Sequence, residues 1–413
     1  MQRIYILIIL FSTINQVYSQ NINQSEAFGN SIILKSDTLQ EEREIQIYLP
    51  ANYQNNSNKY PVLYVLDAQR YFLNGIAFQQ NLTWENIVPE FIIVGINTDS
   101  QKRRNLFYKE SSKFIEFLNK ELIPEIDAKY RTLDERIYFG WEMAAGLGVE
   151  IFADNPSLFK GFLLSSPTHI SKERLEMVSK RLKSNPRQNL KLYSVLGTVE
   201  NWATESMFSL DSIFKVHSKE NIQWKYNLSD DENHYTTPLI TINKGLKLIF
   251  SDYKPIRFYT LKEFSDFGGI TALREHYNNR GNRYQIAGDV HNDTKRYLFM
   301  LSYRENNFEV FDELVKEFDG IVFIANNFNN ATWFYRYATF FLTNNKLDDA
   351  LEVLEAGLLK SPNASILHFS KGNYYKTIGK NKEAKEWYKK AIQIARTNNE
   401  PELEKYTYEL KKL

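Results

Sequence analysis

Apolar and polar residues follow one another along residues 31–253 in a pattern that predicts short strands separated by helices. Residues 61–66 (PVLYVL) and 91–96 (FIIVGI) are continuous apolar runs of the length expected for strands buried on both faces. Residues 31–34 and 43–49 have the pattern of an antiparallel entry pair, and residues 110–130 are amphipathic at helical spacing. The other expected elements are strands at 136–139, 161–164, 190–196 and 222–226, and helices at 142–153 and 236–250. This alternation predicts an α/β fold, with a mostly parallel sheet covered by helices on both faces.

The chain becomes helical from about residue 292, and its last part repeats itself at a shift of 34 residues. Small residues and large apolar residues recur at equivalent positions of this repeat. A 34-residue period of this kind is typical of tetratricopeptide repeats, here over about 331–398, with residues 400–412 as a capping helix. A generic bundle of helical hairpins is the alternative. The first helix of each unit is expected to line a peptide-binding groove, with Tyr335, Tyr337, Asn373 and Lys376. The aligned pairs are Ala338 with Gly372, Phe341 with Tyr375, Ala350 with Ala384, Leu354 with Tyr388, and Gly357 with Ala391.

The N-terminus has the organisation of a signal peptide. Arg3 gives a positive start, residues 4–11 (IYILIILF) form an apolar stretch, and Val17-Tyr18-Ser19 fits a cleavage site before Gln20. A buried strand or a membrane anchor is the alternative, although the apolar run is shorter than a bilayer span requires. We therefore expect a signal peptide at 1–19 and an exported protein, periplasmic or extracellular. An α/β domain is expected at 20–254, a connector at 255–290 and a TPR-like helical domain at 291–413.

Composition narrows the classes of function. The 413 residues include 51 basic and 50 acidic ones, so net charge gives no argument for nucleic acid or an anionic membrane surface as a partner. With no cysteine, the chain has neither disulfides nor thiolate chemistry. The histidines show no pair at metal-ligand spacing, and no glycine-rich phosphate loop is present. We therefore expect neither a metal nor another cofactor.

Residues 136–146 (RIYFGWEMAAG) carry the main chemical signal. An apolar strand runs into a tight turn rich in small residues and then directly into a helix. In α/β-hydrolases this arrangement lifts one side chain above the edge of the sheet and leaves the next backbone N–H free to bind an oxyanion. Here the raised residue is Glu142, and no serine, threonine or cysteine lies between Glu135 and Asp154.

The segment resembles the nucleophile turn (G-x-S-x-G-G) of esterases of the esterase D and enterochelin-esterase type, and other landmarks follow in the family's order. The resemblance covers about residues 31–250 and departs from the family at the nucleophile, where Glu142 replaces serine. The further landmarks are 60–67 (YPVLYVLD), 156–159 (PSLF), 166–168 (SPT), 196–200 (LGTVE) and Asn233-His234.

The resemblance implies an α/β-hydrolase (esterase-like) fold for the domain at 20–254, and it implies a set of site residues. Glu142 occupies the nucleophile position, Glu200 lies where the family has its acid, and His234 lies where it has its histidine. The backbone N–H groups of Met143 and of Ala68 or Gln69 would form the oxyanion site. Three aromatic residues next to these positions could line a pocket or simply pack: Trp141, Trp202 and Tyr235.

Two classes of function remain open from the sequence. In the first, the protein is an ester or acyl hydrolase, with serine-type turnover weakened or lost, or with unusual chemistry of Glu142 and His234. Glu142 could act as a nucleophile, act as a base on water, or form an ion pair with His234. In the second, the domain is a non-catalytic module that binds a small ester or acyl ligand, or a protein or peptide through the helical tail. Glu142 favours the second class, and Glu200 with His234 favours the first.

Overall fold

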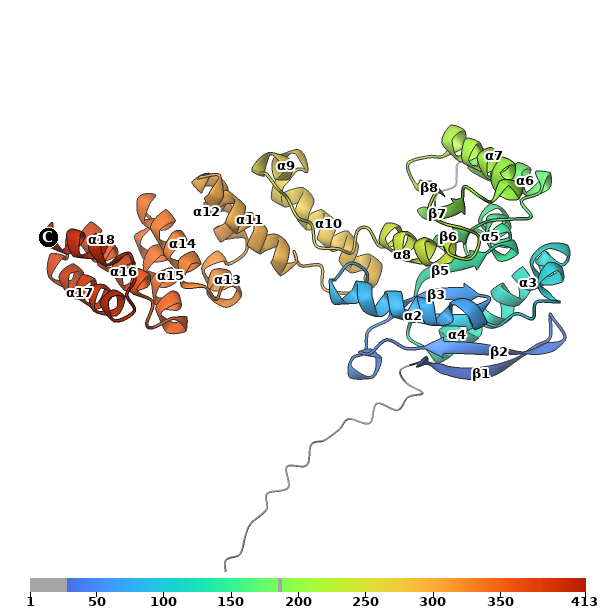
Figure 1. Cartoon of the computed structure of the whole chain (residues 1–413), viewed down its shortest axis with the longest axis horizontal. Coiled ribbons are helices and arrows are strands. Elements are labelled where there is room, and N and C mark those ends of the chain that lie inside the picture. The colour runs from blue at the N-terminus through green and yellow to red at the C-terminus, as the bar shows by residue number, and fades with distance from the viewer. Residues whose placement is uncertain (1–27, 185–187) are drawn as a thin grey trace, which may run out of the picture. The chain divides into compact units, whose positions relative to one another are not determined.

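The computed structural model describes residues 28–184 and 188–413, and the chain divides into two compact units, Met1–Ser251 and Asp252–Leu413 (Figure 1). The expected signal peptide, residues 1–19, lies outside the described residues. No helix of the described part is both long and apolar enough to cross a membrane.

The first unit is built on one eight-stranded sheet with the order β1-β2-β4-β3-β5-β6-β7-β8 among the described residues. β1 with β2 and β2 with β4 are antiparallel, and every other neighbouring pair is parallel. The mostly parallel sheet expected from the sequence is therefore confirmed. The strands are β1 (Asn30–Ser36), β2 (Glu41–Tyr48), β3 (Tyr60–Leu66), β4 (Ile92–Ile96), β5 (Thr132–Trp141), β6 (Gly161–Ser165), β7 (Leu190–Gly197) and β8 (Ile222–Ser229).

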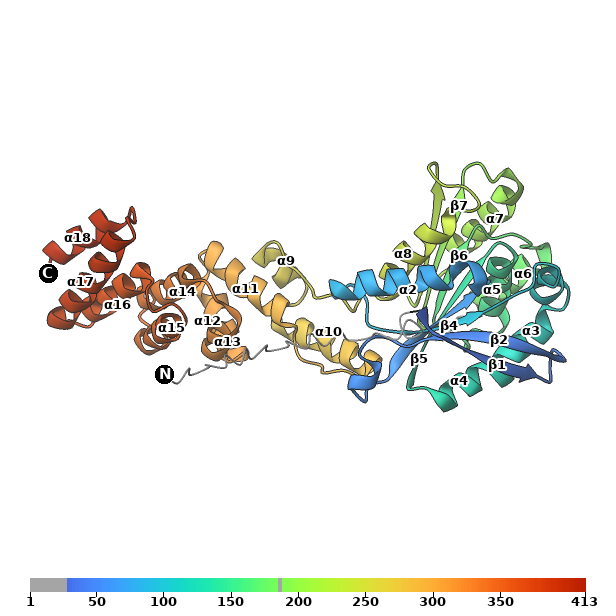
Figure 2. The ribbon, with the colours of Figure 1, turned by 60° about the horizontal axis from the view of Figure 1, so that its bottom comes forward.

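Helices cover both faces of this sheet (Figure 2). On one face α2 (Ala68–Trp84) and α8 (Thr237–Ile249) contact each other and the central strands. On the other face α5 (Met143–Asp154), α6 (Lys172–Lys183) and α7 (Asn201–His217) pack side by side. Every residue of β3 and β4 is buried, which is why their sequences are continuous apolar runs rather than alternating ones.

The helix expected at 110–130 is present in two parts. α3 (Ser111–Phe117) and α4 (Ile123–Lys129) are joined by a wider π-helical turn, Leu118–Leu122. Pro124 lies at the start of α4 and has no backbone N–H, so the regular helical hydrogen bond cannot continue there. Apolar periodicity does not reveal this local change.

The second unit is helical throughout its described elements. Residues 255–290 contain α9 (Leu261–Asp266) and α10 (Gly269–Tyr284). These are followed by α11 (Asn292–Arg304), α12 (Phe308–Glu317) and α13 (Gly320–Asn327).

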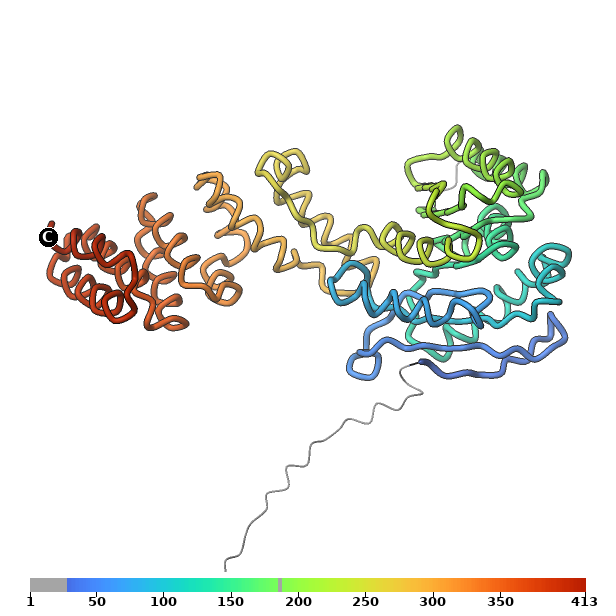
Figure 3. The backbone as a smooth tube through the Cα atoms, in the orientation of Figure 1, coloured from blue at the N-terminus to red at the C-terminus, as the bar shows by residue number. Residues whose placement is uncertain are grey.

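Two helix pairs and a final helix α18 (Leu403–Lys411) complete the second unit (Figure 3). The first pair is α14 (Ala331–Thr343) with α15 (Leu347–Lys360), and the second is α16 (Ser365–Thr377) with α17 (Asn381–Thr397). α16 begins 34 residues after α14, and α17 begins 34 residues after α15. The helices therefore recur with the period that the sequence predicts.

Candidate active site

The turn between β5 and α5 holds Glu142 in an unusual backbone conformation. Glu142 has φ 57° and ψ −117°, values that a residue with a side chain rarely adopts. The turn is fixed by the Glu142 N–H, which donates to Ser165 O at 2.9 Å, and by the Thr168 N–H, which donates to Glu142 O at 3.1 Å. Gly140 permits strand and helix to approach, because a Cβ there would lie 2.6 Å from the Ala144 carbonyl. The expected strand, tight turn and helix are all present, with Glu142 at the turn.

The Glu142 side chain is ion-paired with an arginine. Arg103 Nη1 donates to Glu142 Oε2, while Arg103 Nε and Nη2 each donate to the Asp67 carboxylate at 2.9 Å. The Asp67 side chain is buried, and the Glu142 side chain is about one quarter exposed. One guanidinium thus joins two carboxylates from the ends of β3 and β5, and the guanidinium also lies 5.1 Å from the Trp141 ring centre.

Arg103 keeps its positive charge in this setting. Burial by itself lowers the pKa of the guanidinium, but the Asp67 and Glu142 carboxylates outweigh burial and raise the pKa above its usual value. The three side chains carry a formal charge of −1 in total when both carboxylates are ionised. The Glu142 carboxylate is consequently held in place by a charged partner.

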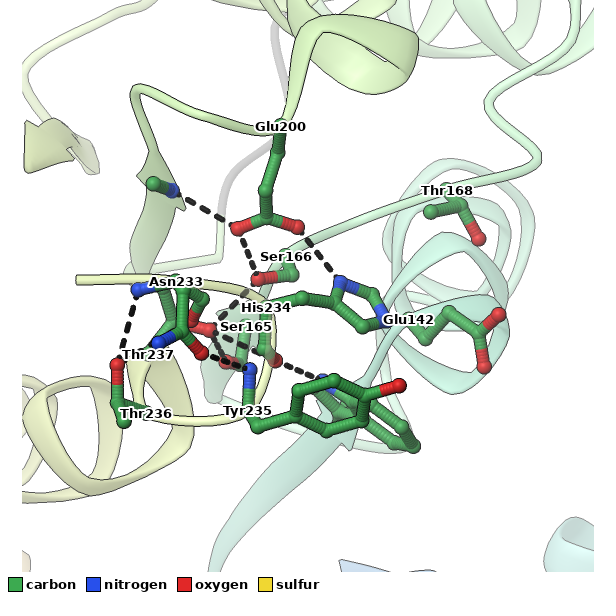
Figure 4. Close-up of polar contacts among 12 residues, drawn as sticks. Glu142, Ser165, Ser166, Thr168, Glu200, Asn233, His234, Tyr235, Thr236 and Thr237 are labelled. Carbon is green, nitrogen blue, oxygen red and sulfur yellow. Dashed lines mark hydrogen bonds and ion pairs between the residues drawn. The ribbon is translucent and has the colours of Figure 1, made fainter.

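Glu200 and His234 are brought together as the sequence predicts. Glu200 lies just before α7, and His234 lies in the loop between β8 and α8. His234 Nδ1 is 2.6 Å from Glu200 Oε2 (Figure 4). The other carboxylate oxygen, Oε1, accepts from Ser166 Oγ at 2.7 Å and from the Gly197 N–H at 2.9 Å. Two donors therefore hold one oxygen of this fully buried carboxylate and orient the other toward the imidazole.

These bonds also set the ionisation of Glu200. Burial opposes the charged form, but the bonds from His234, Ser166 and the Gly197 N–H outweigh burial and hold the pKa of the carboxyl below its usual value. Glu200 is consequently an ionised partner for the imidazole at neutral pH.

Aromatic side chains surround the His234 imidazole. Its ring centre lies 4.8 Å from that of Trp141, 5.3 Å from that of Tyr235 and 5.8 Å from that of Trp202. Trp141 Nε1 also donates to the His234 carbonyl oxygen at 2.7 Å, so this buried indole fixes the histidine loop. Trp202 and Tyr235 are 66% and 69% exposed, which leaves their faces accessible to a ligand.

An open cavity of about 490 Å³ connects these parts. Its lining includes Glu142, Thr168, His169, Trp202 and His234. Burial lowers the pKa of His169, which favours its neutral form. The volume lies within the range of about 300–1,000 Å³ typical of small-molecule sites. The expected nucleophile position and the expected histidine therefore face the same space.

Glu142 and His234 do not form the ion pair considered above. The carboxylate of Glu142 is bonded to Arg103, and the described contacts contain no bond between Glu142 and the imidazole. In Figure 4 the carboxylate lies at the end of the Glu142 side chain farther from His234. With Nδ1 directed at Glu200, the imidazole has Nε2 left for the cavity.

The three residues expected to supply oxyanion donors lie at helix N-termini. Met143 is the first residue of α5, and Ala68 and Gln69 are the first two residues of α2. N–H groups at these positions have no acceptor within their own helix. The Gln69 side chain exchanges two hydrogen bonds with the Thr98 backbone, at 2.9 and 3.1 Å, and so fixes the loop after β4 to the start of α2. These three residues therefore remain the predicted oxyanion donors.

Sequence reasoning missed the cavity-lining residues Thr168 and His169, and it missed two residues that bond to the predicted ones, Arg103 and Ser166. Arg103 lies in a polar stretch, Lys102-Arg103-Arg104, that reads as a solvated surface, and only its position after β4 hints at the sheet edge. Ser166 matches a family landmark, but its bond to Glu200 requires a backbone with φ 42° at the end of β6, which no pattern predicts.

The groove expected in the helical tail is not supported at the residues named for it. Tyr337 is fully buried, so it was wrong as a groove-lining residue. The Asn373 side chain accepts from Tyr388 Oη at 2.6 Å, and Lys376 Nζ is 2.9 Å from Glu409. Tyr335 is half-buried. The polar groups of Asn373 and Lys376 bind partners within the unit, on α17 and α18. Aligning two repeat units does not show that these neighbouring helices cover the predicted groove residues.

Residues 36–237 match the family model described as "Putative esterase", and residues 367–398 match that of a tetratricopeptide repeat. No protein with a curated description matches the chain. Within residues 28–184 and 188–413, no group of three or more His, Asp or Glu side chains is placed to hold a metal ion.

Two solved structures show the likeness in fold. One is an IroE-like serine hydrolase from Shewanella oneidensis, with a TM-score of 0.55 and 19% identity, covering 69% of this chain and 97% of that one. The other is an uncharacterised protein from Capnocytophaga ochracea, with a TM-score of 0.60 and 20% identity, covering 88% of this chain and 93% of that one. Residues 36–237 are therefore similar to the "Putative esterase" family and have an α/β-hydrolase-like fold, and the helical C-terminal part carries a tetratricopeptide repeat.

Proposed function

We propose that the first unit is an exported esterase-type domain that binds an ester or acyl ligand but has weak or no serine-type hydrolysis. The observation that carries this proposal is the side chain at the turn after β5. Glu142 stands there instead of serine, and its carboxylate is bonded to Arg103. No serine, threonine or cysteine lies between Glu135 and Asp154 to replace it.

The chemistry of a carboxylate supports this conclusion. If Glu142 attacked an ester carbonyl, the new C–O bond would form a mixed anhydride as the alkoxide departed. An anhydride lies uphill of the acyl-serine ester that serine esterases form, so the covalent route has no favourable intermediate. A carboxylate beside the Met143 N–H would also repel the oxyanion that such a site must stabilise.

The His234–Glu200 pair supports a second candidate, slow hydrolysis by activated water. Nδ1 of the imidazole is bonded to an ionised carboxylate, and Nε2 is left for the cavity. In that geometry His234 can accept a proton from water as the water attacks an ester carbonyl, with no covalent intermediate. This route needs neither a hydroxyl at position 142 nor movement of Glu142 away from Arg103.

The deciding experiment compares residues 20–413 with the Glu142→Ser variant on p-nitrophenyl esters. We expect little or no turnover by the parent and a gain in kcat/KM of about 100-fold or more in the variant. A Glu142→Ala variant is the matched control, because it also frees Arg103 but supplies no hydroxyl. The proposal fails if the parent is as fast as the serine variant, or if the folded serine variant gains nothing over the alanine one.

A fluorophosphonate probe separates the two candidates. The serine variant should be labelled at residue 142, and the parent should not. Turnover by the unlabelled parent that His234→Ala abolishes would establish the water route. Turnover that survives His234→Ala would exclude it.

Export rests on the sequence of the N-terminus. Arg3, the apolar residues 4–11 and Val17-Tyr18-Ser19 support cleavage before Gln20. Intact-mass measurement on protein from the periplasm or medium should give a chain that begins at Gln20. Recovery of a chain that retains Met1 in the cytosol would contradict export.

A protein or peptide partner is proposed for the tetratricopeptide repeat. Stacked helix pairs of this kind present extended surfaces to other chains. The support is the repeat itself, because the groove residues expected from the sequence are engaged within the unit. Affinity capture with residues 252–413, compared with residues 20–251, would show whether a partner is retained specifically by the helical part.

A further inference from the structure

A second cavity, unrelated to the esterase site, lies within the helical unit. Its volume is about 390 Å³, again in the range of about 300–1,000 Å³ found for small-molecule sites. It is lined by the segment before α9, by α11 and by α14. Its lining combines three arginines with aromatic and apolar side chains, and none of the described lining residues is acidic.

The arginines are held by aromatic rings. The Arg257 guanidinium lies 4.2 Å from the Tyr297 ring centre and 5.3 Å from that of Tyr259. The Arg336 guanidinium lies 4.7 Å from the Trp333 ring centre. The N–H groups of a guanidinium point outward in its own plane. Stacking on a ring covers only one face, so these groups can still donate to an anion.

The third guanidinium is fixed by the backbone. Arg304, at the end of α11, donates to Tyr259 O at 3.1 Å. This bond ties the helix to the segment that carries Arg257, so two cations are placed on adjoining walls. Arg304 is exposed and keeps further N–H groups for a ligand.

The nearby carboxylates do not neutralise these cations. Glu263 accepts from the Tyr259 N–H at 2.8 Å, and Glu305 accepts from the Leu261 N–H at 3.1 Å. In the described part of the chain, none of the three lining arginines is within ion-pair distance of a carboxylate. By contrast, Arg274 in the same unit is paired with Glu317. The cavity therefore concentrates uncompensated positive charge.

We propose that this cavity binds a planar aromatic carboxylate. A carboxylate can accept two parallel N–H bonds from a guanidinium, and it would relieve the mutual repulsion of three cations. A flat ring would fill the apolar floor at Met300 and Leu301 and pack against Trp333. A bare inorganic anion would leave the aromatic walls unused, and a neutral ring would leave the charge unbalanced.

The same chemistry has two sources, a free aromatic acid or the C-terminal aromatic residue of a peptide. The probes for the first are 2-naphthoate and its uncharged analogue 2-naphthamide. The probes for the second are N-acetyl-Gly-Phe with a free carboxylate and the same dipeptide as its C-terminal amide. Tighter binding of the free acid, or of the dipeptide acid, identifies the source.

Isothermal titration of residues 20–413 provides the test. We expect 2-naphthoate to bind. The affinity for 2-naphthamide should be lower by at least about tenfold. Arg336→Gln and Arg304→Gln should each weaken 2-naphthoate by about tenfold. Arg396→Gln is the matched control, since Arg396 is exposed on α17 and does not line the cavity. Trp333→Leu should weaken the binding of 2-naphthoate. Trp333→Phe keeps an aromatic ring, so its affinity should stay close to that of the parent.

Three results would overturn the proposal. The first is equal affinity for each acid and its amide. The second is a pair of lining variants that bind like Arg396→Gln. The third is the absence of binding heat with both acids. Thermal melts of each variant show whether the fold is intact, and the exposed Arg304→Gln keeps the test valid if Arg336→Gln does not fold.

Discussion

Arg103 Nη1 donates to Glu142 Oε2 while the rest of the same guanidinium is bonded to Asp67. The residue at the expected nucleophile position is thus part of an ion-pair network that begins in the buried end of β3. Asp67 contributes both of its oxygens and is fully buried, whereas Glu142 contributes one and is partly exposed. The network therefore depends on Arg103 more than on Glu142.

Replacing Arg103 should destabilise the first unit strongly. Arg103→Met leaves the buried Asp67 carboxylate without a partner, so we expect the free energy of unfolding to fall by about 3–5 kcal/mol. The exposed neighbour Arg104 provides the control. Arg104→Met should change the free energy of unfolding by less than about 0.5 kcal/mol. Urea denaturation followed by circular dichroism measures both. Equal effects of the two substitutions would show that the network does not stabilise the fold.

In the Glu142→Ser background, activity should depend on Glu200. Glu200→Gln keeps the shape of the side chain but removes the charge that orients and stabilises the imidazole. We expect kcat to fall by about 10²–10⁴-fold, as for other acid–base partners. Glu205→Gln, on the exposed side of α7, should leave kcat unchanged. A Glu200→Gln protein that hydrolyses p-nitrophenyl esters at the unchanged rate would remove Glu200 from the catalytic role.

Glu200 should also make stability depend on pH. Its pKa in the folded chain lies below the usual 4.5, because the bonds from His234, Ser166 and the Gly197 N–H outweigh burial. The unfolded chain then binds more protons in the acidic range, so the stabilisation by Glu200 is complete above pH 4.5 and is lost as pH falls through the folded pKa. Denaturation curves at several pH values should show a smaller acid-induced loss for Glu200→Gln than for the parent. Parallel pH dependences in the two proteins would contradict the assignment.

A methyl group added at Gly140 should destabilise the turn. A Cβ there would lie 2.6 Å from backbone atoms of Ala144. These atoms belong to α5 and cannot shift without distorting the helix. We expect Gly140→Ala to cost about 1–3 kcal/mol of unfolding free energy. In Gly75→Ala, within α2, the nearest atom would be 3.4 Å from the new Cβ, and helix propensity favours alanine by about 1 kcal/mol. Comparable stability of the two variants, measured by thermal melting, would show that the strand and helix can separate at the turn.

Much of the fold and the outline of the site follow from the sequence. The runs at 61–66 and 91–96 predict buried strands because a parallel sheet covered on both faces leaves no polar side. The apolar runs and the 34-residue repeat are local in sequence or recur at a fixed spacing, so a single chain reveals them. Glu200 and His234 were predicted from the resemblance to the esterases, and their 2.6 Å contact agrees with that prediction.

Arg103 and the cavity of the helical unit were not predicted, for a common physical reason. Whether Lys102, Arg103 or Arg104 turns inward depends on the backbone of a loop, and adjacent residues of like charge give no signal of it. The cavity depends on residues 257, 304 and 336, which come from three separate segments. Tyr337 was placed on a groove because the repeat pattern shows which positions are equivalent but not which neighbouring helices cover them.

The first unit should fold without the helical one. Each unit has a hydrophobic core built from its own residues, one drawn from residues 45–222 and the other from residues 258–374. A chain of residues 20–251 keeps every strand of the sheet and α8, so no core position of the first unit is lost. We expect it to unfold in one cooperative transition and, as the Glu142→Ser variant, to retain the esterase activity of the longer chain. Aggregation or a broad, non-cooperative melt would show that residues 252–413 complete the first core, and the helical part would then not be a separable binding module.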